Sequence, residues 1–261
     1  ISFLTYFIKD DGNILCSGLY SNTSTSGAAG AFYLEIENET LEVVVENLVE
    51  FGLDFITQGL SERATKRTKK RASKGKDVEL YSYEVRNLIE KEDGGLVMVA
   101  EQYYVRVTTT TTTNANGTTS TQTTYHYYYN DIVVVSFDEE GEIEWHDKIE
   151  KAQYSTNDGG YYSGFNMVVK GDKMHFYFVD QAYSVPGLDV DRRTDKKSYK
   201  SNHFVHATLD LDGNKEVQSL GEIQRKEFRP VPKEFVSMRD GRSTIYLRGR
   251  KAYKLGRIVV E

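Results

Sequence analysis

Residues 93–149 constrain the fold more than any other stretch of the chain. Two short runs there, Leu96–Ala100 and Ile132–Val135, are apolar at every position, and a threonine- and tyrosine-rich segment separates them. Short apolar runs of this kind are typical of strands that are covered on both faces. Asp93-Gly94 and Glu140-Gly141 lie beside the runs, and glycine supplies the positive φ that tight hairpin turns need. The stretch therefore predicts four short antiparallel strands joined by tight turns.

The segment between the two apolar runs predicts a long projecting hairpin. Thr108–Thr113 and Thr118–Thr124 are rich in threonine, a good strand former, and residues 114–117 can form a turn. If Thr113 pairs with Thr118, the same register brings Val97 opposite Val134, so that the two apolar runs meet. A register shifted by two residues around Asn116-Gly117 is the alternative.

Weaker copies of this pattern recur on both sides of it. They cover residues 1–50, 160–222 and 233–261, with residues 81–150 as the central copy. Tandem four-strand units are typical of a β-propeller, in which neighbouring blades cover both faces of each sheet. We therefore predict an all-β class and one propeller-like domain over residues 1–261 with about four blades. The alternative is a sandwich of two stacked sheets.

The two ends of the chain also bear on this prediction. The chain starts at Ile1 inside a strand-like run, and the last copy is short. Both features fit a larger ring of which this chain is a part and whose N-terminal portion is missing.

Residues 51–80 interrupt the pattern with a helical, basic insertion. Apolar residues at helical spacing and a basic run from Arg63 onward predict one helix from about Leu53 to Ala72, ended by Gly75. The apolar positions are Leu53, Ile56, Leu60 and Ala64. The basic half is either a solvated surface or a site for an anionic partner, in which case the predicted contacts are Lys66, Arg67 and Lys70.

Composition excludes several classes of protein. The net charge of −6 and the pI near 5.5 do not favour a nucleic-acid partner. No apolar run reaches the roughly 18 residues that a membrane-spanning helix needs. Cys16 is the one cysteine, so the chain has no disulfide framework.

The motif around Asp93 resembles a known repeat. Asp93-Gly94-Gly95, together with residues 141–145 (Gly-Glu-Ile-Glu-Trp), is similar to the repeats of exported bacterial propeller-like proteins. Residues 54–58, the basic helix, residues 92–95 and 101–105 and the hairpin together resemble one family of exported β-propeller-like proteins of Bacteroidetes. The resemblance covers most of residues 50–180. It implies a propeller-like fold and a location in the periplasm, at the outer membrane or on the cell surface, and it implies no activity.

No motif of a catalytic or cofactor site occurs in the chain, so we predict no catalytic residue, no cofactor and no metal site. His203 and His206 lie three residues apart, on opposite faces of a strand, and are therefore poor joint metal ligands. Asp210, Asp212 and Asn214 resemble the start of a calcium loop, but a hairpin turn explains them as well.

Two further acidic groups have a structural interpretation. Asp10, Asp93 and Asp240 recur at the first turn of their copies, where an aspartate shapes the turn by accepting hydrogen bonds from backbone amides; a catalytic carboxylate pair is the alternative. Residues 182–202 form a predicted charged loop, in which basic residues between Asp189, Asp191 and Asp195 oppose cation binding.

The hairpin carries the strongest indication of a binding surface. Tyr125, Tyr127 and Tyr129 share one strand face, and His126 and Tyr128 share the other. Exposed aromatic ladders can stack on sugar rings or anchor peptides, whereas the structural interpretation is cross-strand pairing that stiffens the hairpin. The predicted partner-binding residues of the hairpin are Tyr103, Tyr104, Arg106, Tyr125, Tyr127 and Tyr129.

These observations together predict a non-enzymatic binding or scaffold protein of the bacterial cell envelope. It would use the hairpin and the face loops to dock a protein or a glycan, or to join an outer-membrane assembly. The alternative is a carbohydrate-active propeller enzyme with carboxylates near its channel.

Overall fold

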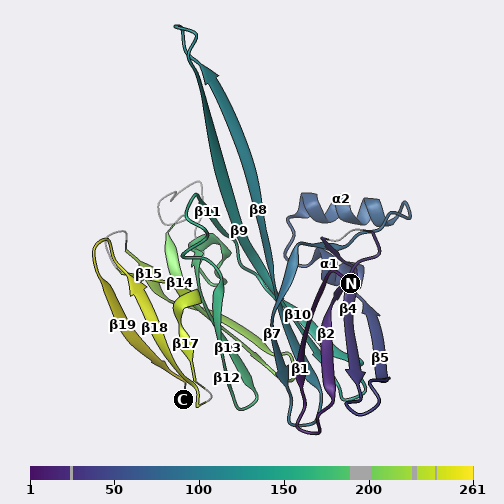
Figure 1. Ribbon diagram of the computed structural model, residues 1–261. Helices are drawn as coiled ribbons and strands as arrows, with labels where there is room; N and C mark the ends of the chain where they lie inside the picture. The colour runs from purple at the N-terminus through teal and green to yellow at the C-terminus, as the bar shows by residue number, and fades with distance from the viewer. Residues whose placement is uncertain (24–25, 189–200, 225–227, 239, 261) are drawn as a thin grey trace. The chain divides into compact units, whose positions relative to one another are not determined.

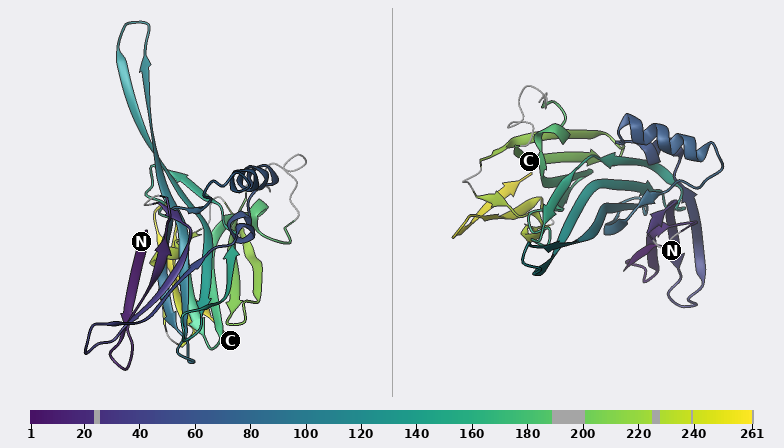
Figure 2. Two further views of the ribbon diagram at one scale, coloured as in Figure 1. Left: turned by 90° about the vertical axis from the view of Figure 1, so that its right-hand side faces the viewer. Right: turned by 90° about the horizontal axis from the view of Figure 1, so that it is seen from above.

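The computed structural model describes residues 1–23, 26–188, 201–224, 228–238 and 240–260. The chain is built mainly of antiparallel strands (Figures 1 and 2). It forms two compact units. Unit 1 comprises Ile1–Gln102 and Asp131–Glu150, and unit 2 comprises Tyr103–Asn130 and Lys151–Glu261.

Unit 1 is built on two antiparallel sheets, and in each of them the strands that are hydrogen-bonded to one another also follow one another along the chain. The first sheet contains β1 (Phe3–Ile8), β2 (Ile14–Tyr20), β4 (Gly30–Ile36) and β5 (Val43–Glu50). The second contains β7 (Tyr83–Glu90), β8 (Leu96–Thr113), β9 (Thr119–Phe137) and β10 (Ile143–Ile149). The short strands β3 (Gly27–Ala28) and β6 (Leu80–Tyr81) pair with each other.

Unit 2 contains the outer parts of β8 and β9, and β11 (Gln153–Thr156) pairs with β9 there. One sheet follows with β12 (Phe165–Lys170), β13 (Lys173–Gln181), β14 (Asn202–Asp210) and β15 (Lys215–Ile223). The last sheet contains β16 (Arg229–Pro230), β17 (Val236–Ser237), β18 (Arg242–Arg248) and β19 (Tyr253–Val259). Two 3-10 turns, η1 (Ala182–Ser184) and η2 (Pro232–Glu234), complete the described elements.

The predicted all-β class is confirmed, and each sequence copy forms one antiparallel sheet. The core of unit 1 combines side chains from both of its sheets, among them Leu15 and Tyr33 from the first and Met98 and Phe137 from the second. Every residue of the apolar runs 96–100 and 132–135 is fully buried, so these strands are covered on both faces, as predicted. The arrangement of the sheets as propeller blades stays a prediction.

Six hairpin turns share one geometry. In each, the first residue of a five-residue segment donates its N–H to the carbonyl of the fifth, and the fourth residue is a glycine with positive φ. These glycines are Gly12, Gly94, Gly117, Gly141, Gly213 and Gly241. The pattern is the three-residue hairpin loop that ends in a left-handed residue, and only glycine takes that conformation at little cost.

Aspartates shape these turns largely as predicted. Asp93 Oδ1 accepts a hydrogen bond from the N–H of Gly95, and Asp240 Oδ1 accepts one from the N–H of Arg242. In the first copy the accepting residue is Asp11, which binds the N–H of Asn13, and not Asp10. In all three turns the accepting aspartate is the third residue of the five-residue segment, and its carboxylate binds the amide two residues further along the chain. Asp10 is the second residue of its segment.

The hairpin forms, but its register differs by one residue from the predicted one. The hydroxyl groups of Thr113 and Thr119 lie 3.2 Å apart, whereas Thr113 was expected opposite Thr118. The cause is the turn, because its loop contains three residues (115–117) with Gly117 at φ 78°, and not the expected two. Asn114 stabilises this loop, since its Oδ1 accepts hydrogen bonds from the N–H groups of Asn116 and Thr118.

The basic insertion contains two helices, α1 (Leu53–Thr57) and α2 (Glu62–Ala72), and the prediction of one continuous helix is wrong. Gly59, with φ 77°, breaks the chain direction, and Ser61 begins α2 as its N-cap by accepting a hydrogen bond from the N–H of Ala64. The break puts Leu60 between the helices, where it is exposed. Gly75 ends the segment with φ 64°, as predicted.

Candidate binding site

Three tyrosines from three neighbouring strands of unit 2 form a row on one sheet face. The rings of Tyr104 (β8) and Tyr128 (β9) stack with centroids 4.6 Å apart at an interplanar angle of 14°. Tyr154 (β11) lies directly opposite Tyr128 in the register, with ring centroids 5.1 Å apart. Tyr154 ends the row and is 52% exposed, so a large part of its ring is open to a ligand.

His126 holds Tyr154 in place. Its Nδ1 lies 2.8 Å from the phenol oxygen of Tyr154, and its Nε2 lies 2.8 Å from Oγ1 of Thr108. Whichever tautomer the imidazole adopts, one nitrogen donates and the other accepts, so both contacts can be satisfied. The ring of Tyr154 is therefore oriented before any ligand arrives.

The opposite face of the hairpin carries a second tyrosine pair that is packed. The rings of Tyr103 and Tyr129 lie 4.6 Å apart, and Tyr129 is buried. Lys233 Nζ donates a hydrogen bond to the Tyr129 hydroxyl at 3.0 Å and lies 4.3 Å from the ring centroid. A Cβ atom on Gly160 would come within 2.4 Å of this ring, so only glycine fits there.

The predicted hairpin residues thus lie in several different environments. Tyr103 and Tyr129 belong to the packed pair, Tyr104 belongs to the row, and Arg106 and Tyr125 are exposed farther along the hairpin. Tyr127 is half-buried and lies opposite Ser155 in the register. The predicted binding residues did not include Tyr128, His126 and Tyr154, although the sequence placed His126 and Tyr128 together on one strand face.

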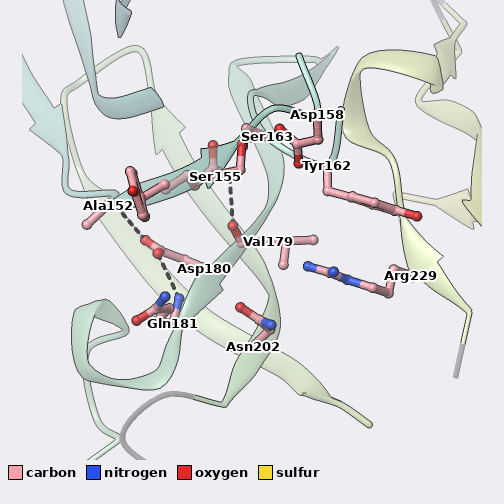
Figure 3. Close-up of a pocket in the computed structure, with 12 residues that line it drawn as sticks. Ala152, Ser155, Asp158, Tyr162, Ser163, Val179, Asp180, Gln181, Asn202 and Arg229 are labelled. Carbon is pink, nitrogen blue, oxygen red and sulfur yellow. Dashed lines mark hydrogen bonds between the residues drawn. The ribbon is translucent and has the colours of Figure 1, made fainter. Parts of the chain in front are cut away.

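A small polar pocket of unit 2 adjoins the row, and Tyr154 lines it (Figure 3). Its volume is about 170 Å³. This is below the roughly 300–1,000 Å³ of pockets for drug-sized ligands, so it suits a single small polar group such as one sugar ring. The residues that line it also include Ser155, Asp158, Tyr162, Asp180, Asn202 and Arg229.

A buried carboxylate lies at the wall of this pocket. Asp180 accepts hydrogen bonds from the N–H of Ala152 at 2.9 Å and from its neighbour Gln181 at 2.7 Å (Figure 3). Burial raises the pKa of Asp180, although these N–H donors act in the opposite direction. The neighbouring Gln153 is fixed as well, since its amide donates to the carbonyl of Val179 and accepts from the N–H of Gly164. The wall is therefore preorganised.

The rim of the pocket offers both hydrogen-bond donors and acceptors. Asp158 accepts hydrogen bonds from the hydroxyl of Ser155 at 2.6 Å and from the N–H of Gly160 at 2.9 Å. The guanidinium of Arg229 lies 4.4 Å from the ring centroid of Tyr162. Charged donors and acceptors make stronger hydrogen bonds than neutral groups do, and an adjacent aromatic ring adds apolar contact. This combination suits a ligand with several hydroxyl groups.

The lysines and arginines of α2 in unit 1 are exposed, and this helix has no buried residue. Lys66, Arg67 and Lys70 all lie on this exposed surface, as predicted. A hollow of about 500 Å³ runs beside the helix, and its basic lining residues are Arg63, Arg67 and Arg71. Lys69 forms an ion pair with Asp54 at 3.2 Å.

The two histidines considered as metal ligands have separate partners. His203 contacts the hydroxyl groups of Ser201 and Ser219, whereas His206 contacts His175. Within the described ranges, no group of three His, Cys, Asp or Glu side chains is arranged to hold a metal ion. Asp210 forms a hairpin turn, as predicted, because its carboxylate accepts from the N–H groups of Asp212 and Asn214.

Two other expectations concern the loop and the membrane. Residues 189–200 of the predicted charged loop, including Asp189, Asp191 and Asp195, lie outside the described residues. In the described parts of the chain, no helix is both long and apolar enough to cross a membrane.

Comparison with known proteins adds little to this site. No family model matches the chain, and no curated protein matches it. Among solved structures, a bifunctional GH43-CE protein of Bacteroides eggerthii is similar, with 11% identity over 99% of this chain and 32% of that chain. The TM-score is 0.25, which does not define a common fold.

Proposed function

We propose that the protein binds a glycan without chemical conversion, through the row Tyr104–Tyr128–Tyr154 and the pocket beside it. One observation supports this most: Tyr154, whose half-exposed ring ends the tyrosine row, is also one of the residues that line a polar pocket. A sugar ring has an apolar face of C–H groups and a rim of hydroxyl groups, so it needs an aromatic surface next to charged donors and acceptors.

We further propose that the recurring sheets are blades of a β-propeller and that the protein acts in the bacterial cell envelope. The consecutive strand order of the sheets and the apolar runs buried on both faces support the blades. The location follows from the resemblance of residues 50–180 to exported proteins.

A comparison of two tyrosines tests the proposal. Binding to a glycan panel would be measured for the parent, Tyr154→Ala and Tyr125→Ala, followed by calorimetry with the best ligand. Both tyrosines are exposed to a similar extent, 52% and 46%, but only Tyr154 lines the pocket. We expect a loss of affinity of at least about tenfold for Tyr154→Ala and little change for Tyr125→Ala.

Two results would contradict the proposal. Equal affinities of the two variants would exclude the pocket and the tyrosine row as the site. Release of new reducing ends from the bound oligosaccharide would instead favour the carbohydrate-active enzyme.

A further inference from the structure

The first sheet of unit 1 has an exposed apolar face. Leu4, Tyr6 and Ile8 of β1 and Leu48 of β5 point away from the core and are between 47% and 66% exposed. The alternate residues of the same strands, such as Phe3, Phe7 and Val45, pack into the core of unit 1. The sheet is therefore apolar on both faces, and its outer strands β1 and β5 expose apolar side chains on the face away from the core.

Apolar residues continue across this face from one outer strand to the other, and those of the central strands, such as Cys16 and Phe32, are buried between them. The register places Leu4 opposite Gly18, Gly18 opposite Phe32, and Phe32 opposite Leu48. A parallel row joins Tyr6 to Cys16 and to Leu34. Several large apolar side chains exposed on one sheet face are a feature of interaction surfaces.

The last sheet of unit 2 has a comparable outer face. Val236, Tyr253, Leu255 and Val259 are between 58% and 65% exposed. Ile245 and Ile258 point to the other side, where they pack against the cluster of Val168, Tyr177 and Phe235.

The charges on the two outer faces are opposite. On the first sheet, the outward positions of β5 include Glu46 and Glu50, and no outward position of its four strands is basic. On the last sheet, the outward positions of β18 and β19 include three arginines and no acidic residue. These are Arg242, Arg248 and Arg257, of which Arg242 is paired with Asp240.

We propose that the outer face of the first sheet of one copy packs on the outer face of the last sheet of a second copy. Two apolar sheet faces can pack about 10 Å apart with their side chains interdigitated. Pairing each face with itself would bring glutamates against glutamates or arginines against arginines, whereas head-to-tail pairing brings opposite charges together. Such a contact uses two different patches, so it can close into a ring of copies.

Two double variants test this contact. The first-face variant carries Tyr6→Glu and Leu48→Glu, and the last-face variant carries Leu255→Glu and Val259→Glu. All four side chains are exposed, so both variants should fold, which circular dichroism and urea denaturation would verify. The corresponding serine variants replace them if a glutamate variant is less stable than the parent.

Sedimentation equilibrium between about 1 and 100 μM would give the mass of each protein and of their mixture. We expect the parent to associate and each variant alone to be a monomer. An equimolar mixture should form a dimer, because each variant retains the face that the other has lost.

Three outcomes would overturn the proposal. A parent that stays monomeric at every concentration would show that copies of this chain do not cover these faces. Association of either variant alone would show that a face pairs with itself. A monomeric mixture would show that the two faces do not bind each other.

Discussion

The Nζ atom of Lys91 lies 2.7 Å from Oε2 of Glu144, and this ion pair joins the two halves of the repeat motif at residues 93–95 and 141–145. Lys91 also contacts Asp93 at 3.1 Å. Although burial alone would lower the pKa of Lys91, its hydrogen bonds to Glu144 and Asp93 raise it. A hydrogen bond from Lys91 in turn lowers the pKa of Glu144.

The second glycine of the motif provides the space for this ion pair. A Cβ atom on Gly95 would lie 2.4 Å from Cε of Lys91 and 2.4 Å from the carbonyl oxygen of Phe137. We therefore expect Gly95→Ala to lower the free energy of unfolding by about 1–3 kcal/mol, the usual cost of overpacking. Gly52→Ala is the matched control, since no atom lies within 4 Å of its added methyl group. Urea denaturation gives the free energy of unfolding of each variant. An equal decrease in Gly95→Ala and Gly52→Ala would contradict this role of Gly95.

A pair of histidines, of which His175 is buried and His206 is half-buried, predicts a loss of stability in acid. His175 Nδ1 lies 3.0 Å from His206 Nε2, and the ring of His206 stacks on Tyr177 with centroids 4.7 Å apart. Burial, assisted by His175, lowers the pKa of His206 to about 4, while Glu216 acts weakly in the opposite direction. Burial also lowers the pKa of His175, with Lys173 and Lys170 adding to the effect.

The direction of the pH effect follows from these pKa values. A histidine with a depressed pKa in the folded state takes up its proton more readily when the chain unfolds. Stability is therefore full above the unfolded pKa of about 6.5 and falls by about 3 kcal/mol as the pH approaches 4. His206→Gln should flatten the dependence of unfolding free energy on pH over this interval. An unchanged slope in His206→Gln, compared with the parent, would contradict the assignment.

The hairpin register predicts a specific set of proton contacts. Since Asn114 and Thr118 form a hydrogen-bonded pair, the alternation of an antiparallel ladder makes 113–119, 111–121 and 109–123 non-hydrogen-bonded pairs. Residues of such pairs approach most closely, in agreement with their hydroxyl separations of 3.2–3.4 Å. We expect strong Hα–Hα nuclear Overhauser effects within these three pairs. Contacts between Thr113 and Thr118 instead would support the two-residue turn.

Much of the fold could be predicted because its determinants are local. Apolar runs such as Leu96–Ala100 indicate strands covered on both faces, and Gly12, Gly94 and Gly241 mark turns where only glycine is unstrained. The hairpin register could not be settled in this way. The sequence Asn-Ala-Asn-Gly suits both a two-residue and a three-residue loop, and the choice between them shifts every pair by one residue.

The helix break and the binding site show where local patterns are insufficient. The helical spacing of Ile56 and Leu60 continues through Gly59, so the pattern does not show that Gly59 turns the chain. Tyr154 joins the tyrosine row because a strand of four residues, Gln153–Thr156, pairs with β9, far away in the sequence. The pocket likewise depends on tertiary contacts of Asp180 and Arg229 that no spacing in the sequence indicates.

In the basic helix α2, the arginines line the hollow beside the helix and the lysines do not. Arg63, Arg67 and Arg71 recur every four residues and line the hollow beside the helix, whereas Lys66, Lys69 and Lys70 do not line it. Guanidinium groups bind carboxylate or sulfate groups in a bidentate manner, and ammonium groups act as point charges. We therefore expect α2 to bind an acidic polysaccharide mainly through its arginines.

Two triple variants that remove the same amount of positive charge distinguish specific binding by the arginines from non-specific electrostatic attraction to the helix. One replaces Arg63, Arg67 and Arg71 by glutamine, and the other replaces Lys66, Lys69 and Lys70 by glutamine. Since α2 has no buried residue, neither should unfold the protein. The affinity of the parent for immobilised dextran sulfate should decrease as the salt concentration rises. At low salt, the affinity of the arginine variant should be several-fold lower than that of the lysine variant, which should largely keep the affinity of the parent. If the parent and both variants bind alike at low and moderate salt, the basic run is only a solvated surface.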